Sequence, residues 1–194
     1  NAASITKLTG TEAEKAKARA SSGIINLFSP DPADINDTAA NLVNYREEDL
    51  NAAGTVTATT PATAAQATIL AAFNKAIVYD VTDIASNIAA ASGAGLNEAV
   101  NITAITPVTI PQRDAIEAAN NSGSNTYNII DTAVNLAAAG NAKLSTAGTV
   151  TAITPATAAQ AIVLAAFNKA IVYDVTDIAS NIAAASGAGL NEAV

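Results

Sequence analysis

The chain has 194 residues, of which half are hydrophobic but only 4% aromatic, and its 17 acidic and 9 basic residues give a formal net charge of −8. This acidic balance disfavours a nucleic-acid partner, because the phosphate backbone repels negative charge. The chain has no Cys and no His, which excludes disulfides and thiolate metal sites and removes the commonest general base. We therefore expect a protein that is not an enzyme, with no catalytic, cofactor-binding or metal-binding residues.

The start and the composition of the chain indicate where the protein works. It opens at Asn1, contains no Met and has no charged segment followed by an apolar leader, so we expect a processed product or a fragment. No apolar run reaches the roughly 18 residues that a membrane-spanning helix needs. An acidic, cysteine-free chain rich in Thr, Asn and Ala is typical of secreted bacterial proteins, and we expect an extracellular or cell-surface location.

An internal repeat dominates the sequence. Residues 149–194 match residues 55–100 with a shift of 94 positions (149 − 55). The two segments differ at three positions, where Thr59, Thr68 and Ile69 become Ile153, Ile162 and Val163. Self-similarity at a fixed period is typical of arrays in which each repeat buries its apolar face against its neighbours.

Each repeat consists of two half-units, and each half-unit reads as a strand followed by a helix. The first, called B, runs TVTAIT and then PATAAQAIVLAAFNKA, and the second, called A, runs IVYDVTD and then IASNIAAASGAGLNEA. Half-units of roughly 22 to 24 residues fit one strand-helix step. The B half-units begin near Ser4, Thr55, Asn101 and Thr149, and a landmark Asp marks the A half-units at Asp37, Asp83, Asp131 and Asp177. The predicted repeats are residues 1–53, 54–100, 101–147 and 148–194.

The first repeat, residues 1–53, is the irregular one. Its B helix, TEAEKAKARA, carries charged residues where the later copies have Ala, Val and Leu. A polar terminal repeat is what an array uses to cover an open end, so we expect residues 1–53 to form a cap. The alternative is a solvated helix that docks the protein to something else.

The B helices are each preceded by a Thr-Pro pair. A Thr before Pro suits an N-cap followed by the first helical residue. In the last B helix, the spacing indicates that Ala161, Leu164 and Phe167 form the packed face. The expected N-caps are Thr60, Thr106 and Thr154, followed by Pro61, Pro107 and Pro155.

The A helices follow the landmark Asp. Its carboxylate can accept the free N–H groups of the first helical turn and lies favourably at the positive end of the helix dipole, so we expect capping at all four positions. Weak contact with a cation is the alternative, although the chain has no acidic, Gly-rich calcium loop, and Asp80 and Asp174 become Asn128 in the third repeat. The short LNEA segments after Gly95 and Gly189 are expected to add a turn of helix.

A recurring Asn lies four residues after each landmark Asp. An Asn buried in every repeat can bond the backbone of its neighbours, so we expect a structural ladder. The four residues are Asn41, Asn87, Asn135 and Asn181.

The strands point to the fold class. Tyr79, Val81 and Asp83 should face one side of their strand, whereas TVTAIT has apolar residues on both sides, which favours parallel strands covered on both faces. Strand-helix units in series need right-handed crossovers. The sequence therefore predicts an α/β fold, a right-handed strand-helix solenoid with parallel strands and leucine-rich-repeat-like steps. A form with A and B strands in separate sheets is the less favoured alternative.

A Thr-x-Thr pattern recurs in the B strands. Regular ranks of Thr on a flat sheet are similar to the surface of ice-binding solenoids, but an interleaved A strand would double the usual strand spacing of about 4.8 Å. Ice binding is therefore a remote hypothesis, and β-branched residues that suit a strand are the simpler interpretation. The pattern occurs at Thr55 with Thr57 and at Thr149 with Thr151.

The motifs YxIxDTAxNLAAA and VTAITPATAAQAxxLAA resemble repeats of very long bacterial secreted or cell-surface proteins, including cyanobacterial and adhesin-like ones. The resemblance covers nearly the whole chain from Ser4 and implies an extracellular structural role. It carries over no catalytic or ligand-binding residue.

The repeat leads to a functional hypothesis. Residues 179–194 match residues 85–100, which are followed by another B half-unit, so we expect the last A half-unit to present an apolar edge that further repeats or a neighbouring chain must cover. The sequence predicts a structural protein that stacks head to tail in a filament, sheath, surface layer or adhesin stalk. The alternative is a glycan- or protein-binding module of a longer adhesin.

Overall fold

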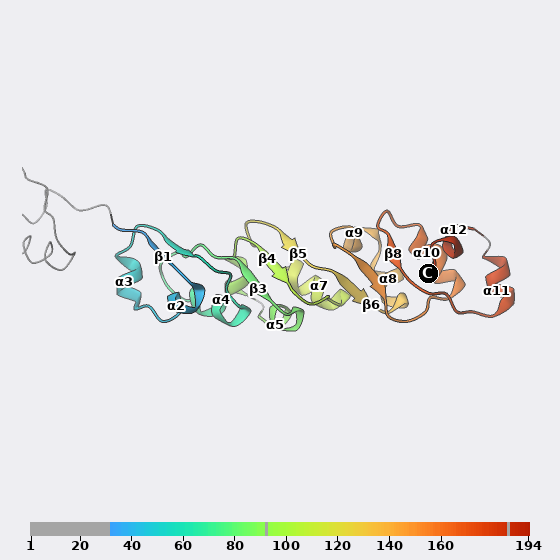
Figure 1. Ribbon diagram of the computed structural model, residues 1–194, viewed down its shortest axis with the longest axis horizontal. Coiled ribbons are helices and arrows are strands. Elements are labelled where there is room, and N and C mark those ends of the chain that lie inside the picture. The colour runs from blue at the N-terminus through green and yellow to red at the C-terminus, as the bar shows by residue number, and fades with distance from the viewer. Residues whose placement is uncertain (1–31, 92, 186) are drawn as a thin grey trace, which may run out of the picture. The chain divides into compact units, whose positions relative to one another are not determined.

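A computed structural model describes residues 32–91, 93–185 and 187–194, and it divides the chain into two compact units, residues 1–33 and 34–194. The described helices and strands belong to the second unit (Figure 1). The predicted strand from Ser4 and the polar helix TEAEKAKARA lie outside the described residues. The cap and docking interpretations of the first repeat therefore stay predictions.

The second unit is a mixed α/β structure with short parallel strands. They pair as β1 with β2, as β3, β4 and β5 in that order, and as β6, β7 and β8 in that order. The strands are β1 (Ile35–Asp37), β2 (Val56–Ala58), β3 (Val81–Asp83), β4 (Ile102–Ala104), β5 (Asn125–Thr126), β6 (Ile129–Asp131), β7 (Val150–Ala152) and β8 (Ile171–Val172).

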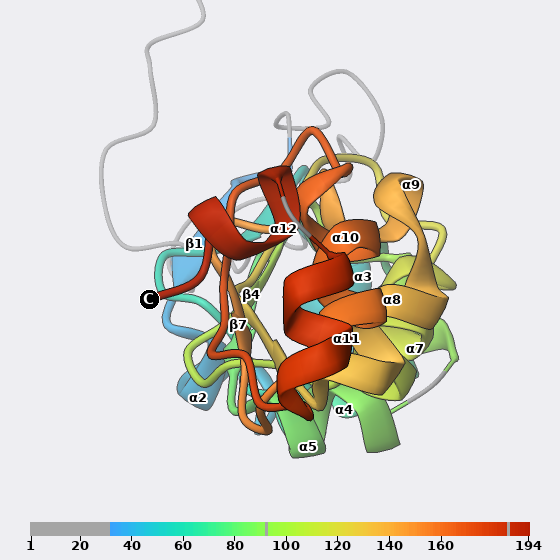
Figure 2. The same ribbon diagram turned by 90° about the vertical axis from the view of Figure 1, so that its right-hand side faces the viewer.

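The helices are equally short and follow the strands. Viewed in Figure 2, α7, α8 and α10 lie beside one another on one side of β4 and β7. The helices are α2 (Ala39–Leu42), α3 (Glu47–Asn51), α4 (Ala64–Leu70), α5 (Ala85–Ala90), α6 (Ala94–Asn97), α7 (Ile110–Glu117), α8 (Ala133–Ala139), α9 (Asn141–Leu144), α10 (Ala158–Ala165), α11 (Ala179–Ala184) and α12 (Ala188–Asn191). The predicted extra turns of helix are present as α6 and α12, but both begin one residue before the glycine and end within LNEA, at Asn97 and Asn191.

A and B strands alternate within the same sheets. Val81 of an A strand pairs with Ile102 of the B strand that follows it, and Ile102 pairs in turn with Asn125 of the next A half-unit. A bridge between Thr57 and Val78 links the B strand β2 to the A half-unit that follows it. The alternative with A and B strands in separate sheets is therefore wrong.

Side chains alternate along the strands as expected. Tyr79 and Val81 are buried, with 2% and 0% of their surface exposed, whereas Val78 is 50% exposed and Val172 is 51% exposed. The expectation that the strands are covered on both faces is therefore wrong at these positions. The apolar residues of TVTAIT do not need a second cover, because single exposed apolar side chains are ordinary on protein surfaces.

The B helices begin three residues later than the Thr-Pro pairs predict. Thr63 is the N-cap of α4, and it forms a capping box in which Thr63 and Gln66 each accept the backbone N–H of the other. Ala62 pairs with Val81 and donates its N–H to Asp80 O, so the chain still belongs to the strand layer after Pro61. The same boxes begin the other two B helices that the structure describes, at Thr109 with Gln112 and at Thr157 with Gln160.

The packed face of the last B helix is confirmed. Ala161 and Leu164 are buried, and Phe167 packs partly buried against the core. Small residues permit a close helix contact, and Gly95 in α6 shows how close. A Cβ on Gly95 would lie 2.7 Å from the backbone nitrogen of Thr68 in α4. Only a residue without a side chain fits there.

Candidate functional site

The landmark residues Asp83, Asp131 and Asp177 each connect two helices. Asp83 Oδ1 accepts the N–H of Ile84 at 2.7 Å and the Asn87 amide at 2.9 Å, while Oδ2 accepts the N–H of Ala64, the first residue of α4, at 3.0 Å. The predicted N-cap assignment is wrong by one position, since the N-cap of α5 is Ile84. Asp83 instead ties the start of its own A helix to the start of the preceding B helix.

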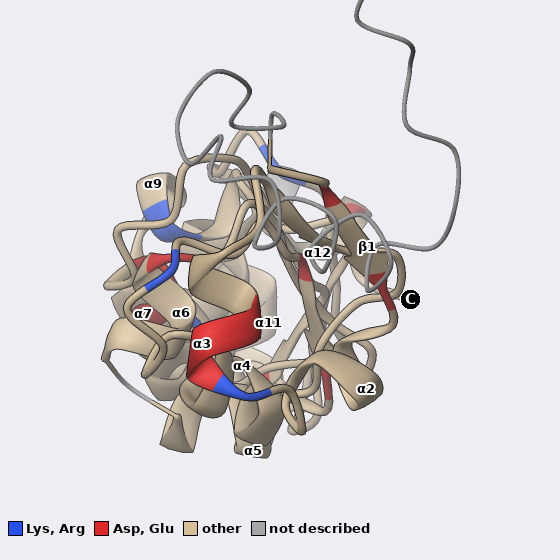
Figure 3. Ribbon diagram, turned by 90° about the vertical axis from the view of Figure 1, so that its left-hand side faces the viewer, with Lys and Arg blue, Asp and Glu red and all other residues tan. Residues whose placement is uncertain are grey.

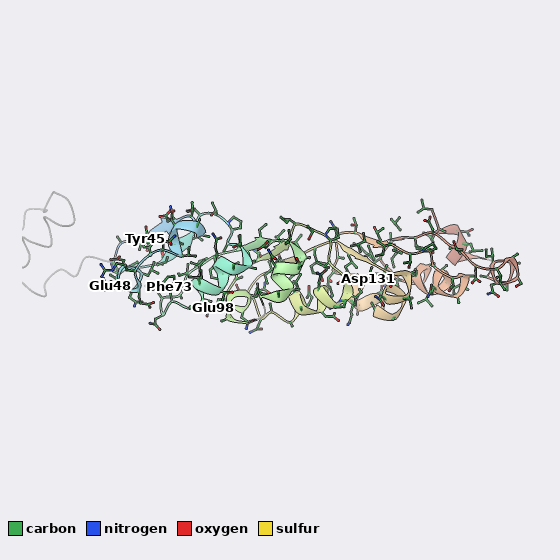
Figure 4. All side chains as sticks on the ribbon, turned by 90° about the horizontal axis from the view of Figure 1, so that it is seen from below. Tyr45, Glu48, Phe73, Glu98 and Asp131 are labelled. Carbon is green, nitrogen blue, oxygen red and sulfur yellow. The ribbon has the colours of Figure 1, made fainter. Side chains whose placement is uncertain are left out.

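Asp131 repeats this arrangement in the third repeat and is the most buried of the series, with 5% of its surface exposed (Figure 4). It accepts the N–H of Thr132 at 2.7 Å, the amide of Asn135 at 2.8 Å and the N–H of Ile110 at 2.8 Å. Burial opposes ionisation, but these hydrogen bonds outweigh it and lower the pKa of the Asp131 carboxyl. The carboxylate is a structural anion.

The Asn series does not form a buried ladder. Asn87 and Asn135 are exposed, and each donates its amide to the landmark Asp of its own repeat. The ladder expectation is wrong, because the nearest acceptor is the carboxylate four residues earlier on the same helical face.

A metal centre finds no support in the described residues. They contain no group of three acidic, His or Cys side chains placed to hold an ion. Both carboxylate oxygens of Asp83 and of Asp131 already accept N–H groups.

The threonine ranks are shorter than the sequence pattern indicates. In β3, β4 and β5 three threonines are register partners, Thr82 with Thr103 and Thr103 with Thr126. The B threonines of the neighbouring sheets instead lie between other residue types, such as Thr151 between Ile130 and Val172. The row of paired threonines therefore does not extend beyond the sheet of β3, β4 and β5. Ice binding stays a remote hypothesis.

The repeat tyrosines point inward. Tyr79 and Tyr173 are each 2% exposed, and their hydroxyls donate to Gly95 O at 2.8 Å and Gly189 O at 2.9 Å. Burial raises the pKa of Tyr79 to about 12. These rings stabilise the core and offer no aromatic surface to a glycan. The glycan- or protein-binding alternative stays a prediction, and these tyrosines do not supply an exposed aromatic side chain for it.

The third repeat holds a polar cluster that the sequence analysis missed. Asp114 Oδ2 accepts from Lys143 Nζ at 2.6 Å, and Asp114 Oδ1 accepts from Arg113 Nη1 at 3.1 Å. Nearby, the Tyr127 hydroxyl donates to Glu117 Oε1 at 2.7 Å. Arg113 Nε and Asn125 Oδ1 are buried without a hydrogen-bond partner in the described structure.

Aligning the third repeat with the second would have revealed this cluster from the sequence. Arg113 takes the place of the buried Ala67 (67 + 46 = 113), and Lys143 takes the place of Gly95 (95 + 48 = 143). The close backbone contact of α4 with α6 is thus replaced, in the third repeat, by an ion pair between longer side chains. We interpret the cluster as a different way of packing the same two helices.

The candidate functional surface lies where an A half-unit contacts the B half-unit that follows it. We call this contact a junction. Figure 1 shows the half-units following one another in chain order along the second unit. At the junction between Asp80 and Thr106, Asp80 Oδ1 accepts the N–H of Asn101 at 3.0 Å, and Thr106 Oγ1 accepts the N–H of Ala85 at 2.9 Å. In addition, Val81 N–H donates to Asn101 O and Ile105 N–H donates to Asp83 O, at 2.8 and 2.9 Å.

The same four hydrogen bonds recur at the other two junctions of the described structure. Asp34 and Asn128 accept the N–H of Thr55 and Thr149, each at 2.8 Å. The hydroxyls that accept the first helical N–H of α2 and α8 belong to Thr60 and Thr154. The threonines predicted as N-caps of the B helices therefore cap the A helices of the preceding half-units.

The last A half-unit carries the same residues without a following partner among those described. Ala85 is 2% exposed and Ile88 is 0% exposed, but their copies Ala179 and Ile182 are exposed and partly buried. Ile178 is 64% exposed. Helix α11, drawn towards the viewer in Figure 2, has no buried residue. We call this surface, formed by residues 174–182, the open junction face.

The far side of the second unit differs in chemistry. Figure 3 shows α3 as an acidic helix, and its first turn holds Glu47, Glu48 and Asp49. Three acids at a helix N-terminus are favourable in the field of the helix dipole. The open junction face instead combines exposed apolar side chains, such as Ile178, with polar groups such as the exposed Asp174 carboxylate.

Comparison of the chain with protein-family models, with curated proteins and with solved structures finds no match. Within the described residues, no helix has both the length and the apolar character that crossing a membrane requires.

Proposed function

We propose that the chain is a structural repeat protein of an extracellular assembly, such as a filament, sheath, surface layer or adhesin stalk, in which copies stack end to end. We further propose that its repeats form a right-handed strand-helix solenoid. The parallel pairing of each A strand with the B strand that follows it supports this finer architecture.

One observation carries the proposal. Residues 85–100 and 179–194 have the same sequence, yet Ile88 is wholly buried while its copy Ile182 is not. A surface that the chain itself uses as an internal contact is complementary to a B half-unit. A heterologous head-to-tail contact of this kind builds a filament when the rotation between copies does not close into a ring.

The proposal does not depend on a catalytic or ligand-binding group. The repeated carboxylates accept backbone N–H groups, and the repeated tyrosines are buried. Extracellular placement follows from the composition and the repeat resemblance, and surface labelling of the producing cells with an antibody tests it. Labelling only after lysis would contradict it.

A substitution in the open junction face tests the stacking. Ile182→Glu places a carboxylate where Ile88 is buried in the internal copy, so we expect assembly to fail while the circular dichroism spectrum is unchanged. Val134→Glu is the matched control, because Val134 is 55% exposed on α8 between two covered junctions. Equal assembly of the two variants would contradict end-to-end stacking through this face.

A further inference from the structure

The open junction face has a defined set of hydrogen-bonding groups. By the repeat relation they are the Asp174 carboxylate, the Val175 N–H, the Asp177 carbonyl and the Ala179 N–H, which match the four groups engaged at each covered junction. None of the four has a hydrogen-bond partner at this edge among the described residues. Val175 is bridged to Ala156 through its neighbours, since Ala156 N–H donates to Asp174 O and Thr176 N–H to Ala156 O. The N–H of Val175 therefore faces the other edge.

The covered junctions state what a partner must supply. Its first residue donates a backbone N–H to the carboxylate, and its sixth residue carries a hydroxyl that accepts the helical N–H, as Thr55 and Thr60 do. Its second residue is apolar and buried, as Val56 is. Between them the backbone pairs as a parallel strand.

Four segments of the chain have this pattern, and three of them are already engaged. The segments that begin at Thr55, Asn101 and Thr149 fill the three covered junctions. The fourth is Ser4–Thr9, SITKLT, which aligns with TVTATT of residues 55–60. It keeps a hydroxyl residue first, an apolar residue second, and Thr at the third and sixth positions.

We propose that the open junction face binds the segment Ser4–Thr9 of a second copy of this chain as an added parallel strand. This inference rests on the proposed stacking and names its contact. Ser4 binds Asp174 and Thr9 caps α11 at Ala179, while Ile5 takes the buried place next to Val175. Main-chain pairing to an exposed strand edge supplies affinity, and the side-chain positions supply register.

Charge also fits this register. At the covered junction, Ala104 is the register partner of Asp83. In the second copy the residue at that position is Lys7, which the register places opposite Asp177. Opposite charges in register on neighbouring strands are favourable.

Cysteine cross-linking tests the contact in the full chain, which has no native Cys. The register pairs Thr6 with Thr176, as Thr103 pairs with Thr82. We expect a mixture of Thr6→Cys and Thr176→Cys chains to give a disulfide-linked dimer under mild oxidation, in a yield at least roughly tenfold above that of the control mixture. The control pairs Thr6→Cys with Thr151→Cys, because Thr151 lies in β7 with paired strands on both sides.

The two proposals fail separately. Equal yields in the two mixtures overturn the Ser4–Thr9 contact, even where the unmodified chain forms filaments. If the cross-linked dimer forms in the predicted register but the average mass of the unmodified protein does not increase with concentration, the Ser4–Thr9 contact is supported and the filament is overturned.

A second pair of variants tests the hydrogen bond between Asp174 and the first residue of the bound segment. Asp174→Ala should lower the cross-linking yield, whereas Asp174→Asn should retain it, because Asn128 accepts the same N–H at 2.8 Å.

Discussion

The Oδ2 atom of Asp131 accepts the backbone N–H of Ile110 at 2.8 Å, although the two residues belong to successive half-units of the chain. Oδ1 of the same carboxylate accepts the N–H of Thr132 at 2.7 Å, next to the start of α8. One anion thus satisfies N–H groups at the starts of two successive helices, which otherwise lack an acceptor. The stability of the third repeat therefore depends on this ionised group.

Asp131→Ala should therefore destabilise the protein strongly. It leaves the Ile110 and Thr132 N–H groups and the Asn135 amide without an acceptor, and hydrogen bonds to a charged group are worth more than neutral ones. We expect a loss of about 3 kcal/mol in the free energy of unfolding, measured by urea denaturation. The control is Asp174→Ala in dilute solution, where the exposed carboxylate has no partner among the described residues. A loss of the same size in both variants would show that the shared carboxylate is not the cause.

Stability should fall in acid. Burial opposes ionisation of Asp83 and Asp131, but hydrogen bonds outweigh it and lower the pKa of these two carboxyls, and that of Asp177, below the ordinary value of 3.8. A carboxyl whose folded pKa is depressed contributes stability above its unfolded pKa, and that stability is lost as the pH falls through the folded value. We expect the urea midpoint to be level at neutral pH and to decrease steadily below about pH 4. A midpoint that stays level or rises between pH 4 and pH 2 would contradict this assignment.

Thr157→Ala should weaken the last B helix. Thr157 Oγ1 accepts the N–H of Gln160 at 3.3 Å, and the Gln160 side chain accepts the N–H of Thr157 at 2.9 Å. Loss of such an N-cap costs about 1 kcal/mol of unfolding free energy, and Thr157→Ser should restore most of it. The same urea assay measures both. If Ser and Ala were equally unstable at this position, the hydroxyl would not be the capping group.

Gly95→Ala should disrupt the contact between α4 and α6. The added Cβ would lie 2.7 Å from Thr68 N, which is backbone and cannot move aside, so we expect a loss of about 2 kcal/mol or more. Lys143→Ala is the companion variant in the third repeat, where it removes the Lys143–Asp114 ion pair, which is half exposed and worth about 0.5 kcal/mol. Thermal unfolding of the two variants measures the difference. A harmless Gly95→Ala would mean that α6 can move away from α4.

Local patterns in the sequence predicted much of this structure. The alternation that buries Tyr79 and Val81 and the apolar stripe of α10 are short-range signals, and the structure confirms both. The parallel pairing of strands also follows from strand-helix units in series. These features need no knowledge of which groups the neighbouring half-unit brings close.

Two of the errors concern groups whose partners are distant in the chain. Thr60 looks like an N-cap because Pro61 follows it, but its hydroxyl binds the N–H of Ala39 in the neighbouring helix. Asp83 looks like a cap for its own helix alone, but half of its carboxylate serves Ala64. Local sequence rules correctly identify Thr60 and Asp83 as residues that accept helical N–H groups. They predict the wrong N–H groups, because the register between half-units decides which N–H group is near.

The concentration dependence of size tests the central claim most directly. Sedimentation of the unmodified chain over a wide concentration series, with electron microscopy of the same samples, measures whether copies add to one another. End-to-end stacking predicts an average mass that grows continuously with concentration and thin fibres in the images. A single monomeric species at every concentration, seen as dispersed particles, would contradict it.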